Sequence, residues 1–181
     1  YYDPTIELVG VRRPDGTLSA LLVNYGCHPV CFNSQNRAIT GDYVSYLKDA
    51  LECSGKIQTA MFTVAGHANV DPRDCVQNEL SVVQGMGQTL AKLVLDALPR
   101  LVAIPGSSVA AANEEWVFQT NWQISHDRVG IYFPESIAGT SVCTVFSGIR
   151  AGEFSIVGMP GEAVSEYRQM LQNRSPFAAS L

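Results

Sequence analysis

The sequence predicts an α/β fold in which mixed β-sheets are covered by helices. Short apolar segments rich in β-branched residues alternate with segments of helical periodicity in the first half of the chain. The second half contains strand-like segments in meander order and one last helix. The chain has 181 residues, 46% of them hydrophobic and 16% charged, which suits one globular domain with a real core. We therefore expect residues 1–181 to form a single domain.

The first half opens with a predicted hairpin. Strand-like segments span residues 6–12 and 18–25, and the Pro14-Asp15-Gly16 tripeptide between them is a strong turn signal. A polar loop follows. Helical periodicity then begins at Asp42 and stops before Gly55.

A strand at residues 58–64 and a long helix at residues 79–98 are predicted next. The helix should end before Pro99 and turn five apolar residues inward, namely Leu80, Val83, Leu90, Leu93 and Val94. Gly85 and Gly87 weaken such a helix by about 1 kcal/mol each relative to alanine. Their presence indicates close packing against a neighbouring helix.

The second half is predicted to be richer in strands. Residues 116–124 alternate between apolar and polar side chains. Residues 141–149 and 153–158 form a predicted hairpin across Arg150-Ala151-Gly152. A final helix is predicted at residues 163–171.

Charge and composition exclude some function classes. The net charge is −5, the isoelectric point is near 5.1, and lysine and arginine are scattered, so no nucleic-acid partner is expected. No apolar run approaches the roughly 20 residues that span a bilayer. The first residues show no signal-peptide pattern, and both ends resemble the interior of a longer protein. We expect the chain to be one piece of a larger molecule.

Three apolar strands end in small-residue corners that carry polar groups. The corners are Gly26-Cys27-His28-Pro29, residues 66–72 with His67 and Asn69, and Pro160-Gly161-Glu162. Binding and catalytic sites gather at strand ends, where several loops converge. Two imidazoles and a carboxylate at one rim suit zinc, which keeps an open position for water in catalytic sites. His28, His67 and Glu162 are therefore candidate site residues.

These candidates also have plain structural interpretations. His28 stands where Pro29 ends a strand and can cap a turn, and His67 can be a surface residue. Glu162 can be a carboxylate in the first turn of a helix, where the macrodipole favours it. Asp42 is interpreted as an N-cap that accepts backbone N–H groups.

The remaining histidine and the cysteines give further alternatives. His126, beside Asp127, is typical of a loop or strand end. Cys27 and Cys31 flank His28 and suggest a structural zinc site, although the spacing is poor for three ligands. Cys27 with His67 suggests a nucleophilic dyad. The five cysteines are odd in number and irregularly spaced, so one disulfide is possible but the sequence does not identify it.

Four blocks of sequence together resemble one enzyme family. They are LVNYGCHPVCF, ITGDYVSYLKDALE, AMFTVAGHANVDPR and FSIVGMPGEAVSEYRQML. In order and spacing they are similar to blocks of the N-terminal catalytic domain of the neutral/alkaline non-lysosomal ceramidase family. The resemblance extends from about Asp3 to Phe177 and is loosest between residues 106 and 142. It implies a ceramidase-like α/β catalytic domain, of which this chain would be an interior part.

The resemblance assigns roles to two corners. In the family, the histidine of the His-Pro corner and the glutamate of the Pro-Gly-Glu corner bind a catalytic zinc, which implies His28 and Glu162 here. The other family ligands are a histidine of an upstream His-x-His-like motif and a downstream tyrosine, and neither can be placed in this sequence. Other segments of the same protein, or another chain, would then complete the site.

The third corner departs from the family pattern. The family has Gly-Asp-x-Asn-Pro or a close variant, and this chain has Ala68-Asn69-Val70-Asp71-Pro72, with the amide and the acid exchanged. Asn69 is a candidate to hydrogen-bond a substrate or to order a ligand. His67 is added before this motif and is a candidate substitute ligand or base.

The resemblance implies a zinc-dependent amidohydrolase. Its substrate would be a lipid amide, the N-acyl sphingoid base ceramide, and its products a fatty acid and a sphingoid base. Zinc would supply a hydroxide nucleophile and polarise the amide carbonyl. The family also implies a secreted or extracytoplasmic enzyme with peripheral membrane contact. Two alternatives stay open: a metal-free binding or structural domain of the same fold, and a hydrolase of the same fold that acts on another amide or an ester.

Overall fold

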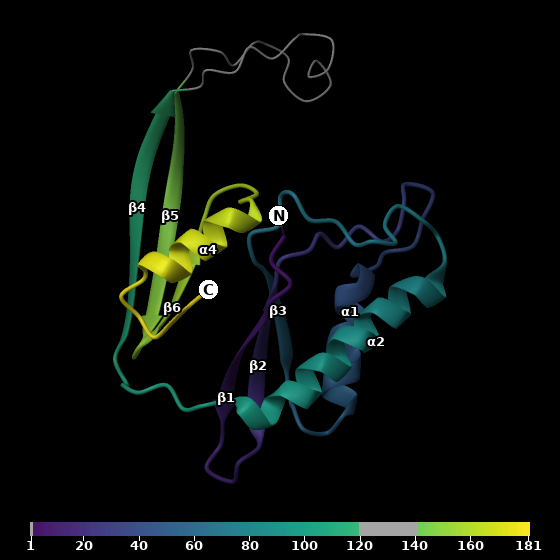
Figure 1. Ribbon diagram of the computed structural model, residues 1–181, viewed down its shortest axis with the longest axis horizontal. Coiled ribbons are helices and arrows are strands. Elements are labelled where there is room, and N and C mark those ends of the chain that lie inside the picture. The colour runs from purple at the N-terminus through teal and green to yellow at the C-terminus, as the bar shows by residue number, and fades with distance from the viewer. Residues whose placement is uncertain (1, 120–140) are drawn as a thin grey trace.

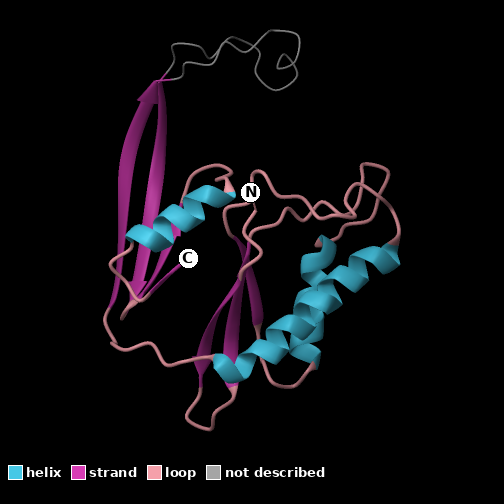
Figure 2. Cartoon of the chain, viewed as in Figure 1, coloured by secondary structure: helices cyan, strands magenta, loops and turns pink. Residues whose placement is uncertain are grey.

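The computed structural model of the chain describes residues 2–119 and 141–181. It contains two β-sheets with associated helices (Figure 1), and the predicted mixed α/β class is confirmed. Figure 2 shows the helices in cyan and the strands in magenta in the same view. In chain order the elements are β1 Ile6–Arg12, β2 Leu18–Tyr25, α1 Asp42–Cys53, β3 Ala60–Val64, α2 Leu80–Ala97, the 3-10 helix η1 Leu98–Arg100, β4 Val109–Gln119, β5 Ser141–Ala151, β6 Phe154–Gly158, α4 Ser165–Arg174 and β7 Ala179–Ser180.

The first sheet has the order β1-β2-β3. β1 pairs antiparallel with β2, which confirms the predicted hairpin, and Gly16 in its turn has φ +89, a conformation that glycine adopts without strain. β2 pairs in parallel with β3 through α1, which lies between them in the chain. Because parallel strands point the same way, the ends of β2 and β3 meet at one edge of the sheet. The histidine corners that follow these two strands therefore lie side by side.

The main core lies between this sheet and the helices α1 and α2 (Figure 1). Leu21 of β2, Leu47 of α1 and Val83 of α2 are among its fully buried side chains. The buried Tyr43 of α1 also reaches the strand end, where its hydroxyl donates a hydrogen bond of 2.8 Å to the carbonyl of Cys27. The core thus fixes the backbone next to the His28 corner.

Helices α1 and α2 pack closely at Gly87. A Cβ atom at this position would lie 2.5 Å from the carbonyl oxygen of Tyr43, so only glycine fits, as predicted. Gly85 has open space instead. The inward positions predicted for Leu80 and Leu93 are wrong, since these side chains are 49% and 51% exposed. The buried face of α2 includes the small residues Gly87 and Ala91, which a pattern of large apolar residues does not reveal. The buried residues are Val83, Gly87, Leu90, Ala91 and Val94.

The second sheet has the order β4-β5-β6-β7. The predicted hairpin between β5 and β6 is confirmed, and β6 pairs in parallel with β7 through α4. The strand predicted at residues 116–124 begins earlier, as β4, because Val109 already pairs with Ala151. Its residues 120–124, and His126, lie outside the described residues.

Helix α4 lies on the side of the second sheet that faces the first (Figure 1). It begins at Ser165, later than predicted, because the backbone before it is used for contacts with the His67 loop: the carbonyl of Ala163 accepts two N–H groups from that loop. Arg168 of α4 pairs with Asp3 and with Glu7 of β1, which ties the two sheets together. In the parts of the chain that the structure describes, no helix is both long enough and apolar enough to cross a membrane.

Candidate metal centre

Three of the predicted site residues converge at one point. His28, His67 and Glu162 each offer one ligand atom, and these atoms all lie within 4.8 Å of one another. His28 follows β2, His67 follows β3, and Glu162 lies between β6 and α4. The two histidines meet because β2 and β3 are parallel neighbours, and the Pro160-Gly161-Glu162 corner approaches them from the second sheet.

His28 is held by the neighbouring loop on both its backbone and its ring. Its backbone N–H donates to the carbonyl of Val70 at 3.0 Å, and ring Nδ1 lies 3.1 Å from the same oxygen. A carbonyl oxygen only accepts, so Nδ1 carries a proton, and in the neutral ring the lone pair is on Nε2. That Nε2 atom lies 3.5 Å from Oε2 of Glu162. The side chain of His28 is 18% exposed, so solvent can reach it. The contact of Nδ1 with the Val70 carbonyl fixes the orientation of the ring.

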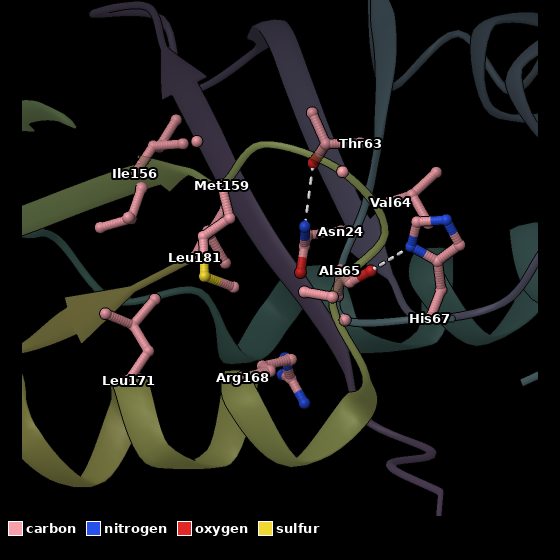
Figure 3. Close-up of a pocket in the computed structure, with 15 residues that line it drawn as sticks. Asn24, Thr63, Val64, Ala65, His67, Ile156, Met159, Arg168, Leu171 and Leu181 are labelled. Atoms are coloured by element: carbon pink, nitrogen blue, oxygen red, sulfur yellow. Dashed lines mark hydrogen bonds between the residues drawn. The ribbon is translucent and has the colours of Figure 1, made fainter. Parts of the chain in front are cut away.

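His67 is oriented in the same manner. Its Nδ1 lies 2.8 Å from the carbonyl oxygen of Ala65 (Figure 3), which again leaves Nε2 with a lone pair. Its backbone N–H, with that of Ala68, donates to the carbonyl of Ala163 at 2.7 and 3.0 Å. The two imidazole centroids are 4.4 Å apart at an interplanar angle of 64°. A carbonyl acceptor on the second ring nitrogen is the usual support of a metal-binding histidine.

Glu162 supplies the third oxygen of the cluster. It lies in the segment before α4 rather than in its first turn, where Glu166 is the acidic residue. The structural interpretation of Glu162 as a first-turn carboxylate is therefore wrong. Gly161, with φ +82, turns the chain directly before it, a conformation that favours glycine. Two imidazoles and one carboxylate form a donor set that suits a catalytic zinc with an open position.

The side chain of Asn69 contacts the start of α4. Its Oδ1 accepts the backbone N–H of Ser165 at 3.0 Å, and its Nδ2 donates to Oε2 of Glu166 at 3.3 Å. An amide from a distant loop thus satisfies one of the free N–H groups at the start of the helix. This contact holds the loop that carries His67 against the segment that carries Glu162. The role predicted for Asn69 toward a substrate stays a prediction.

Two acids contact the segment around His28. Asp71 places Oδ1 3.5 Å from Nδ1 of His28. Asp42 is buried, has φ +52, and its carboxylate accepts the N–H groups of Phe32 and Tyr43 at 3.0 and 2.8 Å. It is the first residue of α1, after the N-cap Gly41, so its predicted N-cap position is corrected by one residue. The carboxylate does accept backbone N–H groups, as expected, and links α1 to the segment after His28.

The cysteines do not take part in this cluster. Cys27 and Cys31 are buried, and burial raises the pKa of their thiols to about 11 and about 12. Thiolates bind metals and act as nucleophiles, and a raised pKa keeps the thiol form at neutral pH. The raised pKa disfavours Cys27 as a nucleophile, and the candidate ligand cluster found among the described residues contains no cysteine. All five cysteines lie in the described residues and are free.

The fold and the donor set together define an α/β protein with a candidate metal centre at a sheet edge. Two solved structures with a similar fold are ceramidases. A neutral ceramidase from Pseudomonas aeruginosa matches with a TM-score of 0.71 and 12% identity, over 95% of this chain and 36% of that chain. A ceramidase complexed with C2 matches with a TM-score of 0.76 and 10% identity, over 99% of this chain and 40% of that chain.

These likenesses concern the fold. At such identities the structures share the architecture of a ceramidase domain, as the resemblance in sequence implied. The chain spans well under half the length of either ceramidase. No protein-family model matches the sequence, and no curated protein matches it.

Proposed function

We propose that this chain is part of a zinc-dependent hydrolase of the ceramidase type. The observation that carries the proposal is the convergence of His28, His67 and Glu162 within 4.8 Å. The fit to zinc rests on the donor chemistry: both imidazoles place Nδ1 near a backbone carbonyl, so both Nε2 atoms are available as neutral ligands. The ceramidase fold of the structural neighbours supports the hydrolase class.

His28, His67 and Glu162 would hold the metal from this chain. Bound zinc would lower the pKa of a coordinated water to about 7 and polarise an amide carbonyl. The Val70 and Ala65 carbonyls keep the two rings in the tautomer that ligation needs. Asn69 keeps the two loops of the site together. His67 would then be a ligand additional to the pair that the sequence resemblance implies, and segments outside this sequence would supply any further ligand.

The proposed substrate is a lipid amide. Hydrolysis of an N-acyl sphingoid base would yield a fatty acid and a sphingoid base, and the support for this choice is the resemblance to ceramidases. The same support extends to a secreted or extracytoplasmic location with contact at a membrane surface. Two alternatives remain. One is a hydrolase of the same fold that acts on another amide or on an ester, and the other is a metal-free binding or structural domain.

Metal analysis of the purified protein tests the proposal. We expect about one zinc per chain by elemental analysis in the intact protein, and loss of that zinc in His28→Ala, His67→Ala and Glu162→Ala. The exposed Glu153→Ala is the matched acidic control and should keep its zinc. Zinc-dependent release of fatty acid from a short-chain ceramide, blocked by a chelator, would support the substrate. Absence of zinc in the intact protein would refute the hydrolase mechanism and leave the metal-free domain.

A further inference from the structure

A pocket of about 250 Å³ lies behind the loop of His67, between the two sheets. Its walls come from the ends of β2 and β3, from the 65–67 loop, from β6 and the segment after it, and from α4 (Figure 3). The larger apolar side chains that line it are Ile156, Val157, Met159, Leu171 and Leu181. This pocket lies beside the candidate metal centre: His67 borders both, whereas His28 and Glu162 do not line the pocket.

Two buried polar side chains, Asn24 and Arg168, line this pocket together with Thr63 and His67. Asn24 is 5% exposed; its Nδ2 donates to Oγ1 of Thr63 at 3.0 Å, while its Oδ1 has no hydrogen-bond partner among the described residues. Figure 3 shows this oxygen on the side of the amide away from Thr63. Arg168 is 4% exposed, and its Nε likewise has no hydrogen-bond partner in the described part of the chain. The residues that carry this buried acceptor and this buried donor both line the pocket.

Such an arrangement indicates a ligand. Buried polar groups in folded proteins are almost always hydrogen-bonded, and a lone acceptor or donor is costly to keep in an apolar environment. A group that both donates and accepts, such as a hydroxyl or a carboxamide, would satisfy Asn24 Oδ1 and Arg168 Nε together.

The charges around the pocket select against an anion. The guanidinium of Arg168 already pairs with two carboxylates, since it binds Asp3 and its Nη2 lies 2.9 Å from Oε2 of Glu7. A third carboxylate would meet a group whose charge is already neutralised. An ammonium group would lose its hydration against the apolar walls. A neutral ligand avoids both penalties.

The volume sets the size of the ligand. A dry protein cavity of about 150 Å³ holds benzene, and typical pockets for drug-sized molecules begin at about 300 Å³. A pocket of about 250 Å³ therefore fits a molecule somewhat larger than benzene and too small for a long acyl chain.

We propose that this pocket binds a small neutral amphiphile whose apolar part contacts Met159 and Leu171 and whose hydroxyl or carboxamide group contacts Asn24 and Arg168. The inference does not depend on the proposed hydrolase function, because it uses neither the metal nor Glu162.

The test is titration with hexanamide and 1-hexanol, followed by NMR of the methionine methyl groups. Both probes should shift the Met159 methyl signal in a saturable manner, and hexanoate should do so at least tenfold more weakly. Asn24→Leu should weaken hexanamide binding roughly 2- to 12-fold, the range expected for one neutral hydrogen bond.

Two further variants control for folding and for non-specific contact. Met159→Trp should fill the pocket and abolish the effect of the probes on the melting temperature. Met170→Trp, on the exposed side of α4 and not part of the pocket, should leave it unchanged. No saturable shift with either probe would show that only water occupies the pocket and would overturn the proposal. Equal binding of hexanoate and hexanamide, or unchanged binding in Asn24→Leu, would overturn the assigned polar contacts.

Discussion

Nε2 of His28 lies 3.5 Å from a carboxylate oxygen of Glu162, although the two residues belong to opposite ends of the chain and follow strands of different sheets. The contact exists because the segment after β6 folds back toward the end of β2 before α4 begins. The same segment accepts the His67 loop through the carbonyl of Ala163. The candidate metal centre is thus a junction between the two sheets as well as a set of ligands.

Substitution of His67 tests whether the chain itself supplies three metal ligands. We expect His67→Ala to weaken zinc binding by at least about 100-fold, because the loss of a direct ligand should exceed the 10- to 100-fold effect of losing a supporting contact. Competition with a chromophoric chelator measures the affinity. Ala68→Ser, next to His67 in the same loop, is the control for a local disturbance of the backbone. An unchanged affinity in His67→Ala would show that His67 is only a neighbour of the site.

Asn69 should act through position rather than chemistry. Asn69→Ala should cost about 1 kcal/mol of unfolding free energy, as for loss of a helix cap, because Ser165 N–H loses its acceptor. Asn69→Asp keeps this acceptor but places a second carboxylate beside that of Glu166, so it should also lower the unfolding free energy. Adding Glu166→Gln removes the repulsion and should restore the stability. Chemical denaturation with parallel zinc titration measures both effects. If Asn69→Ala left stability and zinc affinity intact but abolished hydrolysis, the side chain would contact the substrate instead.

Local sequence patterns predicted the strands and helices well because each of these elements satisfies its own periodicity. The turn at Gly16, the start of α1 near Asp42 and the close approach at Gly87 each follow from one local steric or capping requirement. The start of α4 did not follow, because the Ala163 carbonyl is used by a loop distant in sequence. The exposure of Leu80 and Leu93 depends likewise on which face of α2 meets α1.

Sequence patterns predicted which residues form the candidate site, but not the contacts that hold these residues in place. The three corners each carry a polar residue after a strand, which is a local signal, and His28, His67 and Glu162 do meet. The roles of Val70 and Ala65 involve backbone carbonyls, which no side-chain pattern encodes. The contact of Asn69 with α4 required the arrangement of both sheets and could not be read from its own loop.

Gly87 and Gly85 form a matched pair in one helix. Both changes to alanine gain about 1 kcal/mol of helix propensity. Gly87→Ala should nevertheless destabilise the protein by about 1–3 kcal/mol or more, the usual cost of overpacking, because its Cβ would lie 2.5 Å from the carbonyl oxygen of Tyr43. Gly85→Ala meets open space and should stabilise it by up to about 1 kcal/mol. Urea denaturation of the two variants measures both; a loss of stability in Gly85→Ala similar to that in Gly87→Ala would contradict the packing of α2 on α1.

Cys31 gives the stability of the protein a dependence on alkaline pH. Burial, with a contribution from Asp42, raises the pKa of this thiol from 9.0 to about 12. Above about pH 9 the thiol of the unfolded chain ionises while that of the folded chain stays protonated, so the unfolded state binds fewer protons and stability falls as the pH rises. Between pH 9 and pH 11 this group should lower the unfolding free energy by at most about 1.4 kcal/mol per pH unit. Denaturant titrations across this range should show a shallower slope for Cys31→Ser than for the exposed control Cys53→Ser. Equal slopes in the two variants would show that the Cys31 thiol ionises at the same pH in the folded and unfolded chains.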